Sequence, residues 1–190
     1  MNWWDKLASM WWEGERQTFP SNPNVKYYYN EKHKVVKEIQ PKVMAEIGVR
    51  AGYSSFAFLS AAPFAKMYAM DIDGNAHGGV KGLFTTLAPK ILKEFNVEFI
   101  TVNSQAIDAL PYDVDFIHID GDHSYKGCMH DLNISKDHAE WILVDDYKFL
   151  PNKVGKATDD FVKENNFEGR FIHDRFRGSY LIHTNFRREG

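Results

Sequence analysis

Short apolar runs alternate with helical patterns along this chain, and the alternation restricts its fold more than any other feature of the sequence. The apolar runs predict strands at residues 43–47, 67–72, 97–102, 114–119 and 141–144. Helical patterns predict helices at residues 32–39, 54–62, 87–95, 126–136 and 153–164. Strands that alternate with helices form βαβ units, whose right-handed crossovers require a parallel sheet. The runs at 43–47 and 141–144 are almost wholly apolar, as strands buried on both faces should be.

The C-terminal part of the chain has a different pattern. Two further strand-like segments, 169–174 and 179–184, flank the short segment 175–178, which is typical of an antiparallel hairpin. Together the patterns predict an α/β fold: a doubly wound, mostly parallel sheet of seven strands with a C-terminal antiparallel hairpin on one edge.

The chain has 190 residues, which suits one compact domain, and its hydrophobic fraction of 44% is sufficient for a packed core. Its first thirty residues contain four of the five tryptophans. We therefore divide the chain into an aromatic-rich segment, residues 1–30, and a single domain, residues 31–190. Trp4, Leu7 and Trp11 have the spacing of a short amphipathic helix. This helix either packs on the main body, which we favour, or forms a lid over a substrate.

Composition excludes several classes of protein. The net charge of −3 argues against a polyanion as the main partner, and no apolar run approaches the roughly 20 residues of a membrane span. The single cysteine, Cys128, rules out a disulfide framework and suits a reducing compartment. The start of the chain lacks the basic leader and apolar run of a secretory signal. We expect a soluble, cytoplasmic protein.

Ligands of doubly wound sheets bind beyond the carboxyl ends of the strands, so the residues that follow each predicted strand are candidates for a site. Gly48 and Gly52 follow the first strand and allow a tight turn close to a ligand, and Ser54 or Ser55 can cap the next helix. This spacing is neither that of a dinucleotide fingerprint nor that of a P-loop. Asp71, after the second strand, can accept both hydroxyls of a ribose, or it can cap a helix or turn.

Carboxylates follow the fourth and fifth predicted strands. Asp120 and Asp122 follow the fourth strand, Asp145 and Asp146 follow the fifth, and all four are expected at one rim of the sheet. Such a cluster is repulsive unless it is compensated. A hard divalent cation such as Mg²⁺ would compensate it, because carboxylate oxygens are its preferred ligands. The alternative is that solvent or nearby arginines satisfy the cluster.

These residues follow one another in the order E-x-G-x-x-x-G-x-S, Y-A-M-D-I, S-Q, F-I-H-I-D-G-D-H-S-Y and D-D. In that order the chain, over roughly residues 40–184, resembles the class I S-adenosylmethionine-dependent methyltransferases, a family with a Rossmann-like fold. It is most similar to the metal-dependent branch that methylates hydroxyls of catechols, caffeoyl-CoA and antibiotic sugars. The D-G-D-H-S-Y segment, followed one unit later by D-D-Y, is the most specific part of the resemblance.

The resemblance implies a role for each of these positions. The residues that would bind S-adenosylmethionine are Glu46, Gly48, Gly52, Ser54, Asp71, Ser104, Gln105, Asp120 and Asp122. Within this set, Asp71 would hold the ribose hydroxyls, and Ser104 with Gln105 would face the adenine. The residues that would ligate a divalent metal, expected to be Mg²⁺, are Asp120, Asp145 and Asp146. Asp122 would support either the cofactor or the metal.

His123 lies three residues after Asp120, and the two are the predicted catalytic residues. In some sugar O-methyltransferases that the chain resembles, a histidine at this spacing is the general base. An imidazole titrates near neutral pH and can accept a hydroxyl proton. The alternative is that His123 only orients other groups by hydrogen bonding. His118 and Cys128 are interpreted as buried core residues.

The predicted activity is metal-assisted transfer of a methyl group from S-adenosylmethionine to a hydroxyl of a small molecule, such as a sugar, a diol or a natural product. The alternatives are non-catalytic binding of S-adenosylmethionine, methylation of nucleic acid, and a metal-dependent hydrolase or oxygenase. Arginines near the C-terminus, Arg177 among them, are expected on a solvated face. The N-terminal aromatic residues, Tyr125, Tyr147 and the loop 150–155 would wall the acceptor pocket. The tryptophan-rich segment also leaves a homo-oligomer open.

Overall fold

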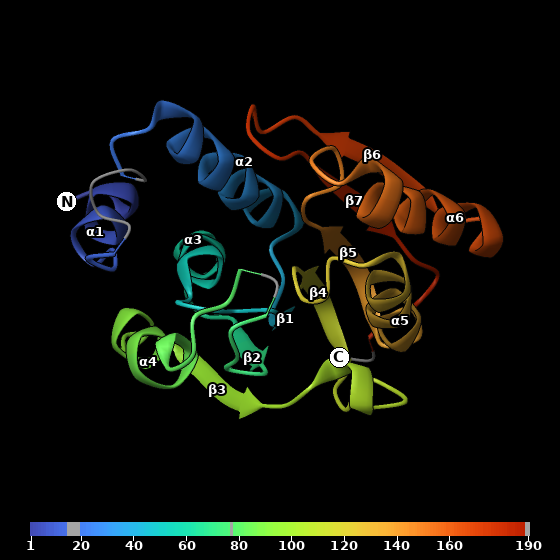
Figure 1. The fold of residues 1–190 in the computed structure, drawn as a ribbon, viewed down its shortest axis with the longest axis horizontal. Helices are drawn as coiled ribbons and strands as arrows, with labels where there is room; N and C mark the ends of the chain where they lie inside the picture. Colours follow the sequence, from blue (N-terminus) through green and yellow to red (C-terminus); the bar gives the residue numbers. More distant parts are fainter. Residues whose placement is uncertain (15–19, 77, 189–190) are drawn as a thin grey trace.

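The computed structural model describes residues 1–14, 20–76 and 78–188 and contains the predicted seven-stranded sheet (Figure 1). Its strands are β1 (Val43–Ile47), β2 (Lys66–Asp71), β3 (Asn96–Thr101), β4 (Val114–Ile119), β5 (Ala139–Val144), β6 (Glu168–Ile172) and β7 (Ser179–His183). They are ordered β3-β2-β1-β4-β5-β7-β6. The first five strands pair in parallel, and β7 runs antiparallel to both β5 and β6. The sequence-based fold class is confirmed, including the C-terminal hairpin.

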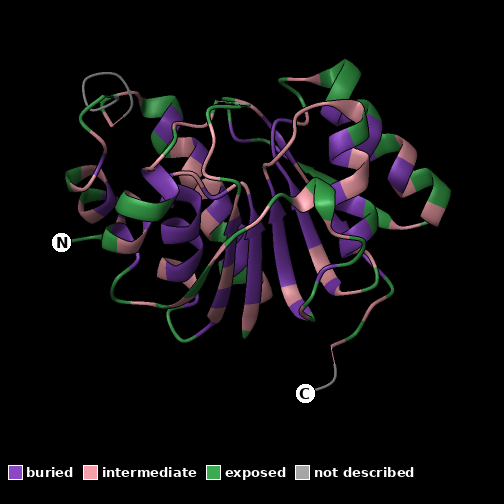
Figure 2. Ribbon diagram, turned by 60° about the horizontal axis from the view of Figure 1, so that its bottom comes forward, coloured by how far each residue is buried: buried purple, intermediate pink, exposed green. Residues whose placement is uncertain are grey.

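Helices cover both faces of the sheet, as a doubly wound fold requires. They are α1 (Trp3–Ser9), α2 (Pro23–Ile39), α3 (Tyr53–Ala61), α4 (Ala88–Ile91), α5 (Tyr125–Ser135) and α6 (Lys156–Asn165). Neighbouring residues of β4 join different apolar clusters, because Phe116 faces the side of α1 to α4 whereas Ile117 faces the side of α5 and α6. Figure 2 shows the resulting buried strands between half-exposed helices. No helix in the described part of the chain has the length and apolarity that a membrane crossing needs.

The N-terminal segment packs on the main body. Trp4, Leu7 and Trp11 are at most 5% exposed and belong to the same apolar cluster as the helix α3. The described residues of the segment thus pack on the main body, which does not by itself decide between the two interpretations, and residues 15–19 lie outside the described part of the chain. The helix predicted at 32–39 in fact begins at Pro23, so the boundary predicted between residues 30 and 31 falls inside α2. The missed signal was Asn22, whose side chain caps the helix ahead of a proline in its first turn.

Two other predicted helices differ from the observed ones in their bounds. The segment 87–95 is helical only to Ile91, and it follows a π-helical turn, η1 (Leu83–Leu87). The helix predicted at 153–164 begins at Lys156, after a second π-helical turn, η3 (Pro151–Gly155). Single π turns interrupt the regular period on which the sequence-based assignment depends, so these boundaries shifted by a few residues.

Candidate functional site

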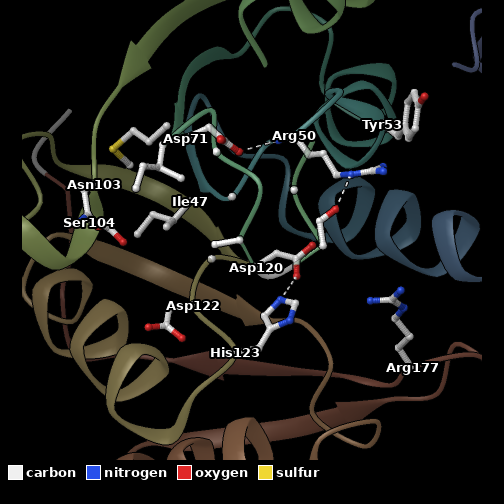
Figure 3. A pocket seen from close by; sticks show the side chains of 18 of the residues that line it. Ile47, Arg50, Tyr53, Asp71, Asn103, Ser104, Asp120, Asp122, His123 and Arg177 are labelled. Atoms are coloured by element: carbon white, nitrogen blue, oxygen red, sulfur yellow. Dashed lines mark hydrogen bonds and ion pairs between the residues drawn. The ribbon is translucent and has the colours of Figure 1, made fainter. Parts of the chain in front are cut away.

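A cavity of about 420 Å³ lies at the carboxyl ends of the parallel strands, where doubly wound sheets bind ligands. It extends from the residues after β2 and β3 to those after β4, so we distinguish a β3 end and a β4 end. The β3 end is lined by Asp71, Ser104 and Gln105, and the β4 end by Asp120, His123 and Arg177. Figure 3 shows the labelled side chains of both ends around this common space.

The turn after β1 forms the floor between the two ends. Gly48 and Gly52 have φ angles of 89° and 84°, in the left-handed region where glycine is favoured. A Cβ at Gly48 would collide with the carbonyl oxygen of Asp120 on the neighbouring strand end. Gly48 lines the cavity, and its N–H donates to the carbonyl oxygen of Met70 at 2.9 Å. The glycine therefore lets the ends of β1 and β4 approach each other beneath the ligand space.

Three of the predicted cofactor residues, Glu46, Gly52 and Ser54, are not among the residues that line the cavity, and Glu46 and Ser54 are buried under this floor. The buried Glu46 carboxylate accepts hydrogen bonds from the hydroxyls of Ser54 and Ser55, and it lies 2.8 Å from Nδ1 of His118. The expectation that a serine caps α3 was wrong, because Gly52 is the capping residue and no side chain caps there. The serines fix Glu46 against the helix start, and this network supports the turn above it.

Asp71 lies at the β3 end with its carboxylate held by backbone groups. Its Oδ2 accepts from the N–H of Arg50 at 2.7 Å, and its Oδ1 accepts from the N–H of Asp73 at 2.6 Å. Burial raises the pKa of Asp71, although these two backbone donors oppose the rise. Each carboxylate oxygen has a second lone pair, so the oriented side chain can accept two hydroxyls of a ligand.

The segment after β3 places three polar residues on the cavity wall. Asn103 caps the short helical turn η2 (Ser104–Ala106), since its Oδ1 accepts from the N–H of Gln105 at 3.1 Å. Asn103, Ser104 and Gln105 all line the cavity. Asp122, from the loop after β4, lines it as well, and its Oδ1 accepts from the N–H of Ser124 at 2.8 Å.

At the β4 end, Asp120 and His123 point toward each other, with 3.0 Å between Oδ1 and Nε2 (Figure 3). The Nδ1 atom of the same ring lies 3.7 Å from Oδ2 of Asp146. The hydrogen bond with Asp120 raises the pKa of His123, and the carboxylates of Asp146 and Asp145 add to the rise against the effect of burial. The imidazole is therefore placed between two carboxylates that stabilise its protonated form.

Asp145 does not join this group, although it was predicted as a metal ligand. Its carboxylate turns toward α2, where it lies 3.0 Å from Nζ of Lys32 and accepts a hydrogen bond from the hydroxyl of Tyr28. Ser179 donates to the same carboxylate at 3.1 Å. Burial alone would raise the pKa of Asp145, but the charges of Lys32 and His118 and the Tyr28 hydrogen bond hold it below its ordinary value.

Asp146 is compensated by an arginine from the loop between β6 and β7. Nη1 of Arg177 lies 3.0 and 3.1 Å from the two carboxylate oxygens of Asp146. Asp174 fixes that loop, because its Oδ1 accepts the N–H groups of Phe176, Arg177 and Gly178. Burial and the neighbouring Asp145 and Asp120 nevertheless raise the pKa of Asp146 to about 6.

Arg177 was expected on a solvated face, and that expectation was wrong. Lys32 had no predicted role, yet its side chain is 1% exposed and contacts Asp145, His118 and Ser179. Lys32 and Arg177 come from segments far in sequence from the carboxylates that they pair with, so the motifs at the strand ends could not predict either ion pair. A lysine on the apolar side of the helix 32–39 was the clue available from sequence. The core interpretations of His118 and Cys128 are confirmed, as both are buried.

Three donors at the β4 end fit a cation by distance. One ligand atom each from Asp120, His123 and Asp146 lies within 4.8 Å of the other two. The set differs from the predicted one, since His123 stands where Asp145 was expected. A nitrogen ligand favours a transition ion such as Mn²⁺ over Mg²⁺, and an ion here would share Asp146 with Arg177.

Aromatic rings wall the cavity on the side of the N-terminal segment, as expected. Trp11, Tyr28, Tyr29 and Tyr53 line it, and the rings of Trp11 and Tyr53 stack with 3.9 Å between their centroids. Phe176 completes this wall from the β6–β7 loop. Two expected contributors lie elsewhere: the hydroxyls of Tyr125 and Tyr147 bond to Asp160 and Asp159 on α6. Likewise, the loop 150–155 is absent from the cavity lining.

Comparison with known proteins agrees with this geometry. The family model described as a methyltransferase domain matches residues 45–147, which include the strand ends β1 to β5. No curated protein sequence matches the chain. Among solved structures, the chain is similar to the SAH-bound methyltransferase PaMTH1 of Podospora anserina, with a TM-score of 0.66 and 16% identity, covering 95% of this chain and 88% of that one. It is also similar to the O-methyltransferase TomG of Streptomyces achromogenes in complex with SAM, with a TM-score of 0.63 and 16% identity, covering 97% and 90%.

A third similar structure is the O-methyltransferase of Bacillus cereus in complex with SAH, with a TM-score of 0.63 and 12% identity, covering 94% of this chain and 89% of that one. At these identities the structural likeness establishes the fold. The family model covers more than half of the chain and establishes the family.

Proposed function

The chain belongs to the methyltransferase-domain family, and from that premise we propose that it transfers a methyl group from S-adenosylmethionine to a hydroxyl oxygen of a small molecule. The observation that carries the proposal is the cavity itself. Its β3 end has side chains that can accept hydrogen bonds from ligand hydroxyls, and its β4 end has an imidazole–carboxylate pair. The bound SAM and SAH named for the similar structures give further support.

The β3 end suits the nucleoside of the cofactor. The Asp71 carboxylate, oriented by two backbone donors, would accept the ribose hydroxyls. Ser104 and Gln105 would face the adenine edge. The methionine part would then cross the glycine turn at Gly48 and bring the sulfonium toward Asp120. A volume of about 420 Å³ lies within the range of pockets that enclose small cofactors.

The β4 end suits the methyl acceptor. In the proposed reaction the acceptor oxygen forms a bond to the methyl carbon, the carbon–sulfur bond breaks, and the sulfur keeps the electron pair as a thioether. His123 takes the hydroxyl proton on its imidazole, and Asp120 stabilises the cation that results. The aromatic wall formed by Trp11, Tyr28, Tyr29, Tyr53 and Phe176 excludes water from the acceptor and holds it against the cofactor.

A divalent cation is a further part of the proposal. Asp120, His123 and Asp146 would hold it, whereas Asp145 would stay paired with Lys32. When bound, such an ion lowers the pKa of a coordinated hydroxyl and fixes its orientation. With an ion bound, His123 would be a ligand instead of the base, and the hydroxyl proton would pass to solvent.

The test is calorimetric binding of S-adenosylmethionine followed by methyl transfer from the radiolabelled cofactor to a panel of sugars and vicinal diols, with and without EDTA. Asp71→Asn should weaken cofactor binding about ten-fold, because it removes a charged acceptor, whereas the exposed Asp108→Asn should not change it. A chain that does not bind the cofactor would overturn the proposal. Transfer to an RNA oligonucleotide but to none of the small acceptors would overturn the assigned substrate class.

A further inference from the structure

Asp131, on α5, is a buried carboxylate that the proposed reaction leaves without a role. The residue is 0% exposed, and its Oδ2 has no hydrogen-bond partner among the described residues. Its Oδ1 accepts a hydrogen bond from Nε2 of Gln105 at 2.7 Å. Burial raises the pKa of Asp131 to about 6, although the Ser104 hydroxyl opposes the rise. Burying such a group is costly, so its contact with the cavity wall needs an explanation.

The contact fixes which way the Gln105 amide faces. The amide nitrogen lies 2.7 Å from the Asp131 carboxylate and 3.4 Å from the carbonyl oxygen of Gly127. Both partners act as acceptors when the carboxylate is ionised, so they select the NH₂ group of the amide over its oxygen. The hydrogen bonds of the Gln105 side chain within the described residues all use Nε2. Its Oε1 is therefore the atom available to a ligand.

Gln105 lines the cavity, whereas Asp131 lies behind it. Because the amide nitrogen of Gln105 is hydrogen-bonded to Asp131, on the side away from the cavity, its carbonyl oxygen is oriented toward the cavity. The β3 end therefore offers a hydrogen-bond acceptor at this position, and the Asp122 carboxylate lines the same cavity. A ligand base that carries an amine here gains a hydrogen bond, and a base that carries a carbonyl meets another acceptor.

We propose that Asp131 is a positioning residue that orients the Gln105 amide, so that the site selects a cofactor base with an exocyclic amine and rejects one with a carbonyl at that position. The inference rests on the proposed function, in which the β3 end holds the cofactor nucleoside. It adds a residue behind the wall and a basis for discriminating adenine from its deaminated form.

The test measures binding of S-adenosylhomocysteine and of its deaminated analogue, S-inosylhomocysteine, by isothermal titration calorimetry. The wild-type chain should bind the amino form about ten-fold tighter or more, which is the usual cost of leaving one acceptor unpaired. In Asp131→Asn the new amide can donate to Oε1 of Gln105, so the glutamine can turn and the preference should fall to within about two-fold. Asp137→Asn, the same change at an exposed site beyond the same helix, should keep the wild-type ratio.

The ratio of the two affinities separates positioning from general damage, because a loosened site weakens both ligands alike. If Asp131→Asn does not fold, Gln105→Ala changes an exposed side chain and should likewise abolish the preference. Equal binding of the two ligands to the wild-type chain would overturn this inference and leave the proposed function intact. An unchanged ratio in Asp131→Asn or in Gln105→Ala would also overturn it, whereas binding of neither ligand would overturn the proposed function with it.

Discussion

The two ends of the cavity are built in opposite ways. At the β3 end, neutral or singly charged acceptors face the cavity and are oriented by nearby backbone or by α5, as Asp71 and Gln105 show. At the β4 end, three carboxylates are compensated by Lys32, Arg177 and His123. The β3 end can thus bind a hydrogen-bonding ligand without rearrangement. At the β4 end, a bound cation would have to replace one of the positively charged side chains that already pair with the carboxylates. The contrast assigns recognition to one end and charge rearrangement to the other.

The largest expected effect tests whether the compensation at the β4 end is essential to the fold. Lys32→Met should lower the free energy of unfolding by about 3–5 kcal/mol at neutral pH, since it leaves the buried Asp145 without its ion-pair partner. In the wild-type chain the pKa of Asp145 lies below its ordinary value of 3.8, so the contribution is present above that pH and is lost as the pH falls further. In the variant, burial dominates and the pKa rises.

The stability deficit of Lys32→Met should therefore shrink as the pH falls toward 4, which urea unfolding at several pH values would measure. Lys37→Met, on the exposed face of the same helix, is the control and should change stability by less than about 0.5 kcal/mol. Equal stability of the two variants would contradict the view that Lys32 supports the β4 end.

The next effect tests the floor that joins the two ends. Gly48→Ala should cost about 3 kcal/mol of stability and abolish cofactor binding, because the methyl group adds a collision with Asp120 to a left-handed backbone. Gly82→Ala is the matched control: its φ is 90°, yet nothing lies within 4 Å of the added carbon, so only about 1 kcal/mol should be lost. Thermal unfolding and calorimetry measure both. Similar losses in the two variants would show that close approach of β1 and β4 is unimportant.

Sequence reasoning located the β3 end well and the β4 end only in part. Gly48, Asp71 and Gln105 are placed by the strand that precedes each of them, so a correct strand assignment also placed the residue. The fold followed for the same reason, because apolar periodicity reports local burial. The orientation of Asp145 depends instead on Lys32, more than a hundred residues away, and no strand-end motif records that contact.

A smaller effect tests His123 as the group that exchanges protons at the β4 end. His123→Gln should lower kcat about a hundred-fold with little change in the KM for the cofactor, which binds mainly at the other end. Because Asp120 raises the pKa of His123, the wild-type ring stays protonated above its ordinary pKa of 6.5. The rate should therefore rise with pH, with its midpoint above pH 6.5, and Asp120→Asn should move this midpoint to lower pH. A pH profile that is unchanged in Asp120→Asn would contradict the pairing.

The smallest effect tests whether a cation can enter the β4 end at all. At pH 8.5, Mn²⁺ at about five times its dissociation constant should raise the free energy of unfolding by about 1 kcal/mol, and Asp120→Asn should abolish the gain. The gain should be smaller at pH 6, because the ion must displace a proton from His123. Arg177→Met should enlarge it, since the guanidinium competes for both oxygens of Asp146. If Arg177→Met leaves the gain unchanged, the arginine and the ion do not compete, and the charges at this end are less tightly balanced than their contacts indicate.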